Sequence, residues 1–550
     1  MKIAVCQLNS VIGDLELNKK KILEHYFKGV QDGVDLVICP ELSLPGYTPQ
    51  DLVEKEEFRN AVSAVTEQIA ECTNKVGLIF GTITEEYDNV GTGLYNSAVL
   101  CYNGKIQFTQ KKTLLPNYDV FDEVRYFESA KEVYIHKFNG VRLGISICED
   151  IWNDSDYWKK RRYSVDPVQR LVDKGAELLI NISASPYAYG KREQRKQMLS
   201  VLTKTDKIPL VYACCAGAQT DLIFDGGSMC FDKNGELKKL GKKFEEDYFI
   251  FDTDTEYTTI VKVEDSFEEE VLKALIFGVK EYATKTGFKK ALLGLSGGID
   301  SALVAYIAVK ALGKENVHVV LMPSKYSSKG SIDDSLKLIK KLDISYDTLS
   351  IQPVFDTVMD VMKEKFTGTE PNIAEENIQS RTRGLYLMAL SNKFNYLLCT
   401  TGNKSEIAVG YATLYGDMCG ALAVIGDIYK TQVYKLANYV NRDEEIIPIE
   451  IIEKAPSAEL RPNQTDQDSL PPYDLLDKII TLYLEDYKEL NEIIKAVGNE
   501  EIVKRTLKLV DLNEFKRKQA APVLRVSTKA FGYGRRFPIV HGWKRNSVIK

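Results

Sequence analysis

The hexapeptide at positions 296–301, Ser-Gly-Gly-Ile-Asp-Ser, has the residue types needed to hold a pyrophosphate group. The apolar run 290–295 before it has the length of a buried strand, and residues 301–312 after it are apolar at helical spacing. Two glycines let the backbone approach a ligand closely, and a helix N-terminus with flanking serine hydroxyls favours phosphate oxygens. Bare phosphate would repel Asp300, so this carboxylate is expected to bind Mg²⁺. The alternative is an ordinary Gly-Gly turn that caps a helix. The residues predicted to form this pyrophosphate and metal site are Ser296, Gly297, Gly298, Ile299, Asp300 and Ser301.

Three segments of the first half also carry reactive side chains near the ends of apolar runs. Glu41 follows the run 34–40, Cys148 follows the run 141–147, and Lys112 lies in the segment 111–118. The sites of α/β proteins lie at the ends of their strands. Taken singly, each residue has an ordinary alternative: a capping carboxylate, a surface charge and a buried thiol. Because the chain has only four histidines, a nucleophile here needs a base other than histidine.

Together these residues resemble the Glu-Lys-Cys catalytic set of the nitrilase superfamily, over about residues 1–250. The match includes Pro-Glu at 40–41, Lys-x-x-Leu-Pro at 112–116 and Cys-Glu-Asp at 148–150. The resemblance implies an α-β-β-α sandwich that hydrolyses an amide through a thioester. Lys112 is then expected to lower the pKa of Cys148 and to stabilise the oxyanion, while Glu41 moves the protons. The remaining residues implied by the resemblance are a supporting Glu123 and, around a glutamine substrate, Tyr118, Glu149 and Ser185.

The second half contains several polar segments that follow predicted strands. They are 322–328, 376–383, 400–406, 415–418 and 426–431. With the loop at 296–301, which looks like that of ATP pyrophosphatases, they resemble the NAD synthetase family over about residues 268–545. A nitrilase half followed by this half is the arrangement of glutamine-dependent NAD synthetases, so the resemblance spans nearly the whole chain.

The resemblance implies that ATP adenylates the nicotinate carboxylate of deamido-NAD, and that ammonia then displaces AMP. The implied substrates are glutamine, ATP and deamido-NAD, with Mg²⁺ as cofactor held by Asp300 and Glu406. It also implies a homo-oligomer and, because ammonium is not a nucleophile, a closed passage for ammonia between the two sites. The other residues expected to bind nucleotide or phosphate are Thr401, Arg381, Lys404, Asp417 and Lys430.

Two other functions are compatible with the pyrophosphate loop alone. One is a glutamine amidotransferase that aminates a different carboxylate or carbonyl group, and the segments 402–406, 415–418 and 426–431 argue against it. The other is a tRNA-modifying protein, which the net charge of −6 and the lack of a CxxC pair disfavour.

For these motifs to act together, the fold must bring the ends of their strands close to one another. The hydrophobic pattern predicts an α/β fold, which does so. The predicted strands are 2–8, 34–40, 76–83, 95–102, 141–147, 176–182 and 209–215, with helices at 17–30, 56–72 and 167–174. Beyond these, a helix is predicted at 269–285, strands at 317–322, 346–351 and 396–400, and helical sequence at 473–510. Parallel strands spaced by helices predict a doubly wound sheet in the second half.

Length and composition limit the kind of protein. A chain of 550 residues is too long for one core, and we expect a first domain at 1–255, a linker at 256–267 and a second domain at 268–550. The composition, 44% hydrophobic and 27% charged, is ordinary for a globular protein, and no apolar run is long enough to span a membrane. Scattered cysteines without a CxxC pair and an N-terminus that begins directly with a strand pattern predict a cytoplasmic location without nucleic-acid or membrane partners.

Overall fold

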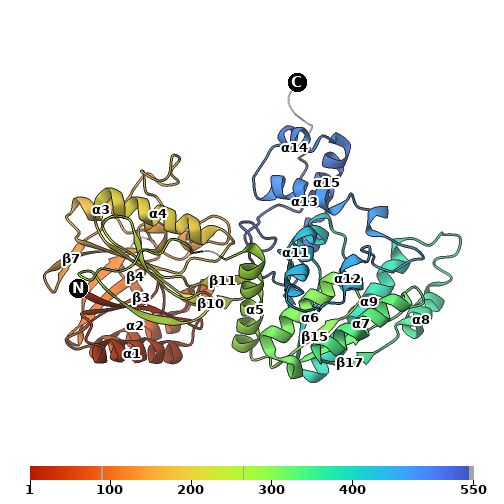
Figure 1. The fold of residues 1–550 in the computed structure, drawn as a ribbon, viewed down its shortest axis with the longest axis horizontal. Helices are drawn as coiled ribbons and strands as arrows, with labels where there is room; N and C mark the ends of the chain where they lie inside the picture. The colour runs from red at the N-terminus through yellow and green to blue at the C-terminus, as the bar shows by residue number, and fades with distance from the viewer. Residues whose placement is uncertain (88–90, 264, 544–550) are drawn as a thin grey trace. The chain divides into compact units, whose positions relative to one another are not determined.

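The computed structural model describes residues 1–87, 91–263 and 265–543, and the chain divides into two compact units, Met1–Asp265 and Ser266–Lys550 (Figure 1). This division falls within the predicted linker 256–267. The predicted domain boundaries themselves stay a prediction. Each unit is described separately.

The first unit is built on two six-stranded sheets. In spatial order the first sheet contains β14 (Asp247–Asp252), β1 (Lys2–Gln7), β2 (Leu36–Ile38), β3 (Gly77–Glu85), β4 (Leu94–Tyr102) and β5 (Lys105–Lys111). The second contains β13 (Leu237–Leu240), β12 (Met229–Phe231), β9 (Leu210–Cys214), β8 (Leu178–Ser183), β7 (Val141–Ile147) and β6 (Ile135–Phe138). A separate hairpin pairs β10 (Ala216–Gln219) with β11 (Leu222–Asp225).

The alternation of side chains along β1 shows how the layers form. Ile3 and Val5 pack with residues of the second sheet such as Ile145, which makes a core between the sheets. Ala4 and Cys6 point the other way, because successive strand residues face opposite sides. They pack under helices α1 (Leu15–Gln31) and α2 (Glu56–Glu71).

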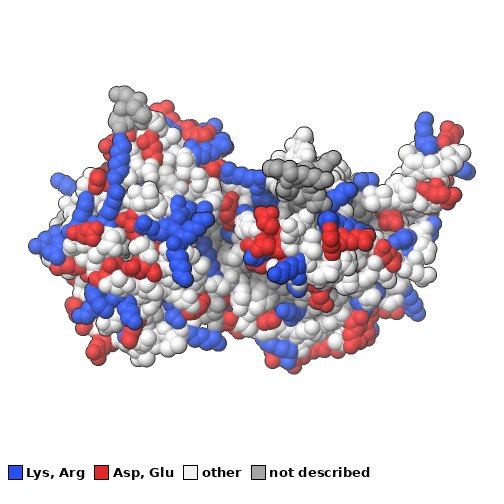
Figure 2. Space-filling view, turned by 90° about the horizontal axis from the view of Figure 1, so that it is seen from above, with Lys and Arg blue, Asp and Glu red and all other residues white. Residues whose placement is uncertain are grey.

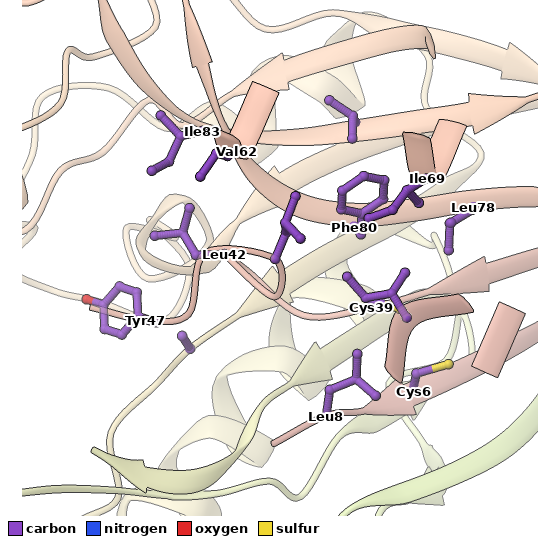
Figure 3. Packing of buried hydrophobic residues seen from close by; sticks show 14 of the residues in the cluster. Cys6, Leu8, Cys39, Leu42, Tyr47, Val62, Ile69, Leu78, Phe80 and Ile83 are labelled. Carbon is purple, nitrogen blue, oxygen red and sulfur yellow. The ribbon is translucent and has the colours of Figure 1, made fainter. Parts of the chain in front are cut away.

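Helices cover the outer face of each sheet. Figure 3 shows Phe80 and Leu78 of β3 beside Ile69 of α2. Helices α3 (Pro167–Asp173) and α4 (Lys191–Asp206) cover the second sheet, where Leu171 and Met198 join its outward-facing residues in one cluster. The order helix, sheet, sheet, helix confirms the α-β-β-α sandwich expected for the first half (Figure 1).

The second unit contains a five-stranded parallel sheet. Its spatial order is β17 (Ser345–Thr348), β16 (Val317–Leu321), β15 (Lys290–Gly294), β18 (Tyr396–Thr400) and β19 (Leu422–Ala423). The chain runs outward from β15 to β17 and then returns to β18 on the other side of β15. In open α/β sheets such a point of reversal is where ligands bind. The doubly wound parallel sheet predicted for the second half is therefore confirmed.

The helices of the second unit pack against this sheet or against one another. They are α5 (Phe267–Thr286), α6 (Ile299–Leu312), α7 (Lys329–Leu342), α8 (Gln352–Met362), α9 (Ile373–Phe394), α10 (Lys404–Val409), α11 (Lys430–Val440), α12 (Ile449–Glu453), α13 (Tyr473–Leu484), α14 (Leu490–Val497), α15 (Glu500–Leu512) and α16 (Glu514–Arg517). The predicted helical stretch 473–510 is thus three helices, interrupted near residues 485–489 and 498–499. None of the helices in the described part of the chain is long and apolar enough to cross a bilayer.

On the face visible in Figure 2, both units carry interspersed acidic and basic side chains, and one group of Lys and Arg side chains lies on the first unit, at the left.

Candidate functional site

Three charged side chains predicted to act together meet in the interior of the first unit. The Lys112 Nζ atom lies 2.7 Å from Oε1 of Glu41, 2.8 Å from Oε1 of Glu123 and 2.9 Å from its Oε2. Asn96 donates to Glu41 at 2.7 Å, and Tyr47 donates to Glu123 at 2.9 Å. Both carboxylates and the ammonium are excluded from solvent. The site is therefore a buried ionic network with most of its hydrogen bonds made.

The backbone around Glu41 fixes this carboxylate after the end of β2. A Cβ atom at Gly81 of β3 would lie 2.0 Å from the backbone nitrogen of Leu42, so only glycine fits there. The backbone N–H of Ala184, just after β8, donates to Oε2 of Glu41 at 2.8 Å. One oxygen of Glu41 is thus held by Ala184, and the other is shared by Lys112 and Asn96.

Asp150 connects the loop that carries Lys112 to the turn that carries Cys148. One of its oxygens accepts from the backbone N–H groups of Thr113 at 3.0 Å and Leu114 at 2.7 Å, and the other accepts from Ile147 at 3.0 Å. Burial raises the pKa of Asp150 to about 7, although these donors oppose the rise. Cys148 itself begins a short 3₁₀ turn, Cys148–Ile151, with a left-handed backbone at φ +44°.

The effect of Lys112 on the thiol has the expected direction, but other groups outweigh it. Lys112 does pull the pKa of Cys148 downward, but burial and the nearby Glu41 carboxylate raise this pKa well above its ordinary value. Burial disfavours the Lys112 ammonium too, yet Glu123 and Glu41 hold its pKa well above the usual range. Burial and Glu41 thus outweigh Lys112, and the raised pKa of Cys148 favours the protonated thiol at neutral pH.

Of the residues predicted to surround glutamine, Glu149 directly follows Cys148 in the chain, and Tyr118 contacts Glu149. Tyr118 donates its hydroxyl to Glu149 at 2.9 Å from Oε1 and 3.1 Å from Oε2. Ser185 is buried just beyond β8. Tyr163, which the sequence patterns do not predict, donates to the same Oε1 of Glu149 at 3.0 Å.

In the second unit, a cavity of about 290 Å³ lies at the reversal point of the sheet. The sequence-predicted residues that line it are Ser296, Gly297, Gly298, Ile299, Asp300, Ser301, Thr401, Glu406, Asp417 and Lys430. Gly297 has φ +77°, and a Cβ atom there would lie 2.4 Å from the carbonyl oxygen of Ser331. Gly298 directly precedes α6, so the N-terminus of this 14-residue helix lies at the cavity.

Two carboxylates and one ammonium meet on the wall of this cavity. Lys430 forms an ion pair with Asp300 and lies 3.7 Å from Glu406. Asn403 donates to Asp300 at 3.0 Å while its oxygen accepts from the Glu406 backbone N–H at 3.0 Å. Burial and repulsion from Asp300 raise the pKa of Glu406 to about 8, although Lys430 opposes this.

A cation would relieve the repulsion between these carboxylates, so the donor set fits Mg²⁺. Among the described residues, no group of three or more His, Cys, Asp or Glu is placed to hold a metal by itself. Mg²⁺ is commonly bound by one or two carboxylates together with substrate phosphates, which matches Asp300 and Glu406 beside the phosphate loop.

Two of the predicted contacts lie away from the cavity wall. Lys404 is fully buried and binds Asp427 at 2.9 Å and Glu485 at 2.8 Å, so its charge is neutralised inside the protein. Arg381 is exposed and donates to the carbonyl oxygen of Leu414 at 3.2 Å. In the sequence, Lys404 and Arg381 stand close to residues that line the cavity. The direction of their side chains, however, depends on packing. Their predicted roles as substrate contacts are not supported by this placement.

The cavity also contains charged residues to which the sequence patterns assign no role. Arg383, two positions after Arg381 on α9, lines the cavity, and burial lowers its pKa to about 10. Lys454 lies 3.0 Å from Glu459, and both line the cavity as well. The helical periodicity of 376–383 could have distinguished the two arginines, because positions two apart face different sides of a helix.

Comparison with known proteins agrees with this division of the chain. The carbon-nitrogen hydrolase family model matches residues 2–262, and the NAD synthase family model matches residues 271–520. A glutamine-dependent NAD(+) synthetase from Synechocystis sp. is 44% identical over 550 residues, covering 98% of this chain and 99% of the relative. A glutamine-dependent NAD(+) synthetase from Thermotoga maritima is 42% identical over 585 residues, covering 99% of each chain.

Solved structures extend the match to three dimensions. The structure of a glutamine-dependent NAD+ synthetase from Acinetobacter baumannii, in complex with adenosine diphosphate, has a TM-score of 0.77 at 36% identity and covers 99% of both chains. A second structure, from Cytophaga hutchinsonii, has a TM-score of 0.82 at 21% identity and supports the fold alone. With both halves matched in order and relatives aligned end to end, this chain belongs to the family of glutamine-dependent NAD(+) synthetases.

Proposed function

We propose that this protein amidates deamido-NAD to NAD, using ATP for activation and glutamine as the source of nitrogen. The observation that carries the proposal is the presence of two separate, differently equipped sites in one chain. A buried Glu41–Lys112–Glu123 network lies beside Cys148 in the first unit, and a cavity with a pyrophosphate loop lies in the second.

In the first unit, the proposed reaction is amide hydrolysis through a thioester. As the Cys148 sulfur attacks the amide carbon of glutamine, Glu41 takes the thiol proton, because a neutral thiol is a poor nucleophile until its proton leaves. The Lys112 ammonium stabilises the oxyanion of the tetrahedral intermediate. The carbon–nitrogen bond then breaks, Glu41 delivers the proton to departing ammonia, and Glu41 next activates the water that releases glutamate.

In the second unit, the proposed reaction is adenylation followed by amidation. The nicotinate carboxylate of deamido-NAD attacks the α-phosphorus of ATP, pyrophosphate leaves, and ammonia then displaces AMP from the adenylate. Gly298 and the start of α6 hold phosphate oxygens, and the buried Lys430 ammonium balances the charge that develops on them. Asp300 and Glu406 would hold Mg²⁺, which when bound neutralises phosphate charge. Thr401, Asp417 and Arg383 would bind the nucleotide parts of the substrates.

Joining these reactions in one chain favours transfer of neutral ammonia without release to solvent. Near neutral pH, free ammonia is mostly ammonium, which has no lone pair with which to attack the adenylate. We expect NAD made from unlabelled glutamine in the presence of ¹⁵N-ammonium to contain little ¹⁵N. Complete mixing of the two nitrogen pools, measured by mass spectrometry of the NAD, would contradict a closed passage.

The whole assignment is tested by measuring NAD formation from deamido-NAD, ATP and Mg²⁺, with either glutamine or ammonium, for the wild type and Cys148→Ala. The variant is expected to lose glutamine-driven synthesis and to keep ammonium-driven synthesis. A wild type that makes no NAD with either donor would refute the substrate assignment, and other carboxylates should then be screened by AMP release.

A further inference from the structure

The buried carboxylate of Glu149 has donors but no positive partner. It is 5% exposed, and the hydroxyls of Tyr118 and Tyr163 both donate to it. Throughout the part of the chain that the structure describes, Glu149 forms no ion pair. A carboxylate has about four acceptor positions, and these two hydroxyl protons leave some of them unused. A buried charge without a partner is costly, so this carboxylate is suited to a cationic group that arrives with a ligand.

A positive side chain lies on the other side of Tyr118. The guanidinium carbon of Arg162 lies 3.6 Å from the centre of the Tyr118 ring. Arg162 is exposed and forms no ion pair with any described residue. An arginine stacked on an aromatic ring keeps its in-plane N–H groups free, and these match the two oxygens of a carboxylate.

The two groups are fixed by one side chain. The hydroxyl of Tyr118 holds Glu149, and the ring of Tyr118 holds Arg162. A negatively charged group and a positively charged group therefore lie at most about one tyrosine side chain apart. An α-amino acid presents an ammonium and a carboxylate on the same carbon and therefore needs two such receptors close together. Glu149 also directly follows the nucleophile Cys148 in the chain.

We propose that Arg162 and Tyr163 determine specificity for the α-amino acid end of glutamine: Arg162 binds the α-carboxylate, and Tyr163 orients Glu149 to bind the α-ammonium. This inference rests on the proposed glutaminase activity of the first unit. It assigns Arg162 as a binding residue and Tyr163 as a positioning residue, and it predicts that the site discriminates against simple amides.

Two analogues of glutamine test the two receptors separately. One is 4-carbamoylbutanoate, which lacks the α-ammonium, and the other is 4-aminobutanamide, which lacks the α-carboxylate. The measured quantities are the KM and kcat for glutamine hydrolysis by the full chain and the inhibition constant of each analogue. The variants are Arg162→Met, which removes the charge, Tyr163→Phe, which removes one hydroxyl, and Arg161→Met as the matched control at the adjacent exposed arginine.

For Arg162→Met, the KM for glutamine and the inhibition constant of 4-carbamoylbutanoate are expected to rise about 10- to 100-fold, as for loss of a charged hydrogen-bonded pair. The inhibition constant of 4-aminobutanamide and the kcat should stay the same. For Tyr163→Phe, the KM for glutamine and the inhibition constant of 4-aminobutanamide should rise about 3- to 10-fold, with 4-carbamoylbutanoate unaffected. Arg161→Met should behave as the wild type.

Several results would overturn the inference. They are equal weakening of both analogues by Arg162→Met, an equal effect of Arg161→Met, and a wild type that neither analogue inhibits. Circular dichroism and the thermal midpoint establish that each variant is folded, and a variant that fails to fold is replaced by Arg162→Gln or Tyr163→Leu with the same expected pattern. A wild type that does not hydrolyse glutamine at all would instead refute the proposed glutaminase activity, and this inference with it.

Discussion

The Lys112 ammonium is bound by two carboxylates in the resting site, and this has a direct effect on the thiol next to it. A cation beside a cysteine ordinarily favours the thiolate, but here Glu41 and Glu123 offset that cation, and burial penalises a further negative charge. Under the proposed function, the thiolate of Cys148 is therefore formed only when a substrate is present and Glu41 accepts the proton. Such a thiol is protected from adventitious alkylation and oxidation.

The reactivity of Cys148 towards iodoacetamide should show this protonation state. Because the pKa of the thiol is raised, it stays protonated through neutral pH, and its alkylation without glutamine should be slow and should accelerate only above pH 9. The measurement is the rate of carbamidomethylation at Cys148 by peptide mapping between pH 6 and 10, with the exposed Cys72 as an internal reference. Rapid alkylation with an apparent pKa below 7 would mean that Lys112 controls the thiol after all.

Residues with a short sequence context could be predicted, and residues that act through tertiary contacts could not. Glu41, Lys112 and Cys148 each stand in a recognisable local motif after a strand or near one. Asn96 and Tyr163 carry no such context, since their contacts with Glu41 and Glu149 span 55 and 14 positions of the chain. Lys404 lies in a motif as well, but it is fully buried, and the motif alone does not indicate this.

At the scale of elements, the phosphate loop depends on a glycine for two separate reasons. Gly297 has a left-handed backbone, and its Cα faces the carbonyl of Ser331 at a distance that leaves no room for a methyl group. Gly287, at the end of α5, is also left-handed, with φ +83°, but nothing lies within 4 Å of its missing Cβ. Alanine variants at these two glycines therefore distinguish the cost of backbone strain from the cost of a steric collision.

Gly287→Ala is expected to lower the free energy of unfolding by about 1–2 kcal/mol, the cost of a left-handed alanine, and to leave the KM for ATP unchanged. Gly297→Ala should be destabilised further and should raise the KM for ATP, because α7 and the loop must separate to admit the methyl group. Urea unfolding and ammonium-driven NAD synthesis provide the two readouts. Equal behaviour of the two variants would show that the contact with Ser331 does not constrain the loop.

Element prediction succeeded for long apolar runs and failed for very short strands and for a highly charged helix. The strands β7 and β18 were predicted with their observed bounds. Helix α4, with many charged residues, and the short strands β10 to β13 were missed. A strand of three or four residues is stabilised by its neighbours in a hairpin or sheet edge, so its own sequence has too few positions to show a period.

At the scale of the whole molecule, each unit has its own sheets and its own hydrophobic clusters, which suggests two separate unfolding transitions. Lys112→Met leaves buried carboxylates without their cation and should destabilise the first unit by about 3–5 kcal/mol. Gly297→Ala affects only the second. Calorimetry of the full chain should therefore show a different transition shifted by each variant, and a common shift of all heat absorption would contradict independent unfolding.

The left-handed backbone conformation of Cys148 has an energetic cost for the folded chain. A cysteine at φ +44° carries strain of about 1–3 kcal/mol, and glycine would adopt the same conformation freely. Under the proposed function, replacing Cys148 by glycine is thus one of the few substitutions expected to stabilise the chain while abolishing its use of glutamine. In a cell with abundant ammonia, selection for stability and drift would both favour that loss. Under the proposed function, the cysteine at this position therefore lowers the stability of the chain in return for the use of glutamine.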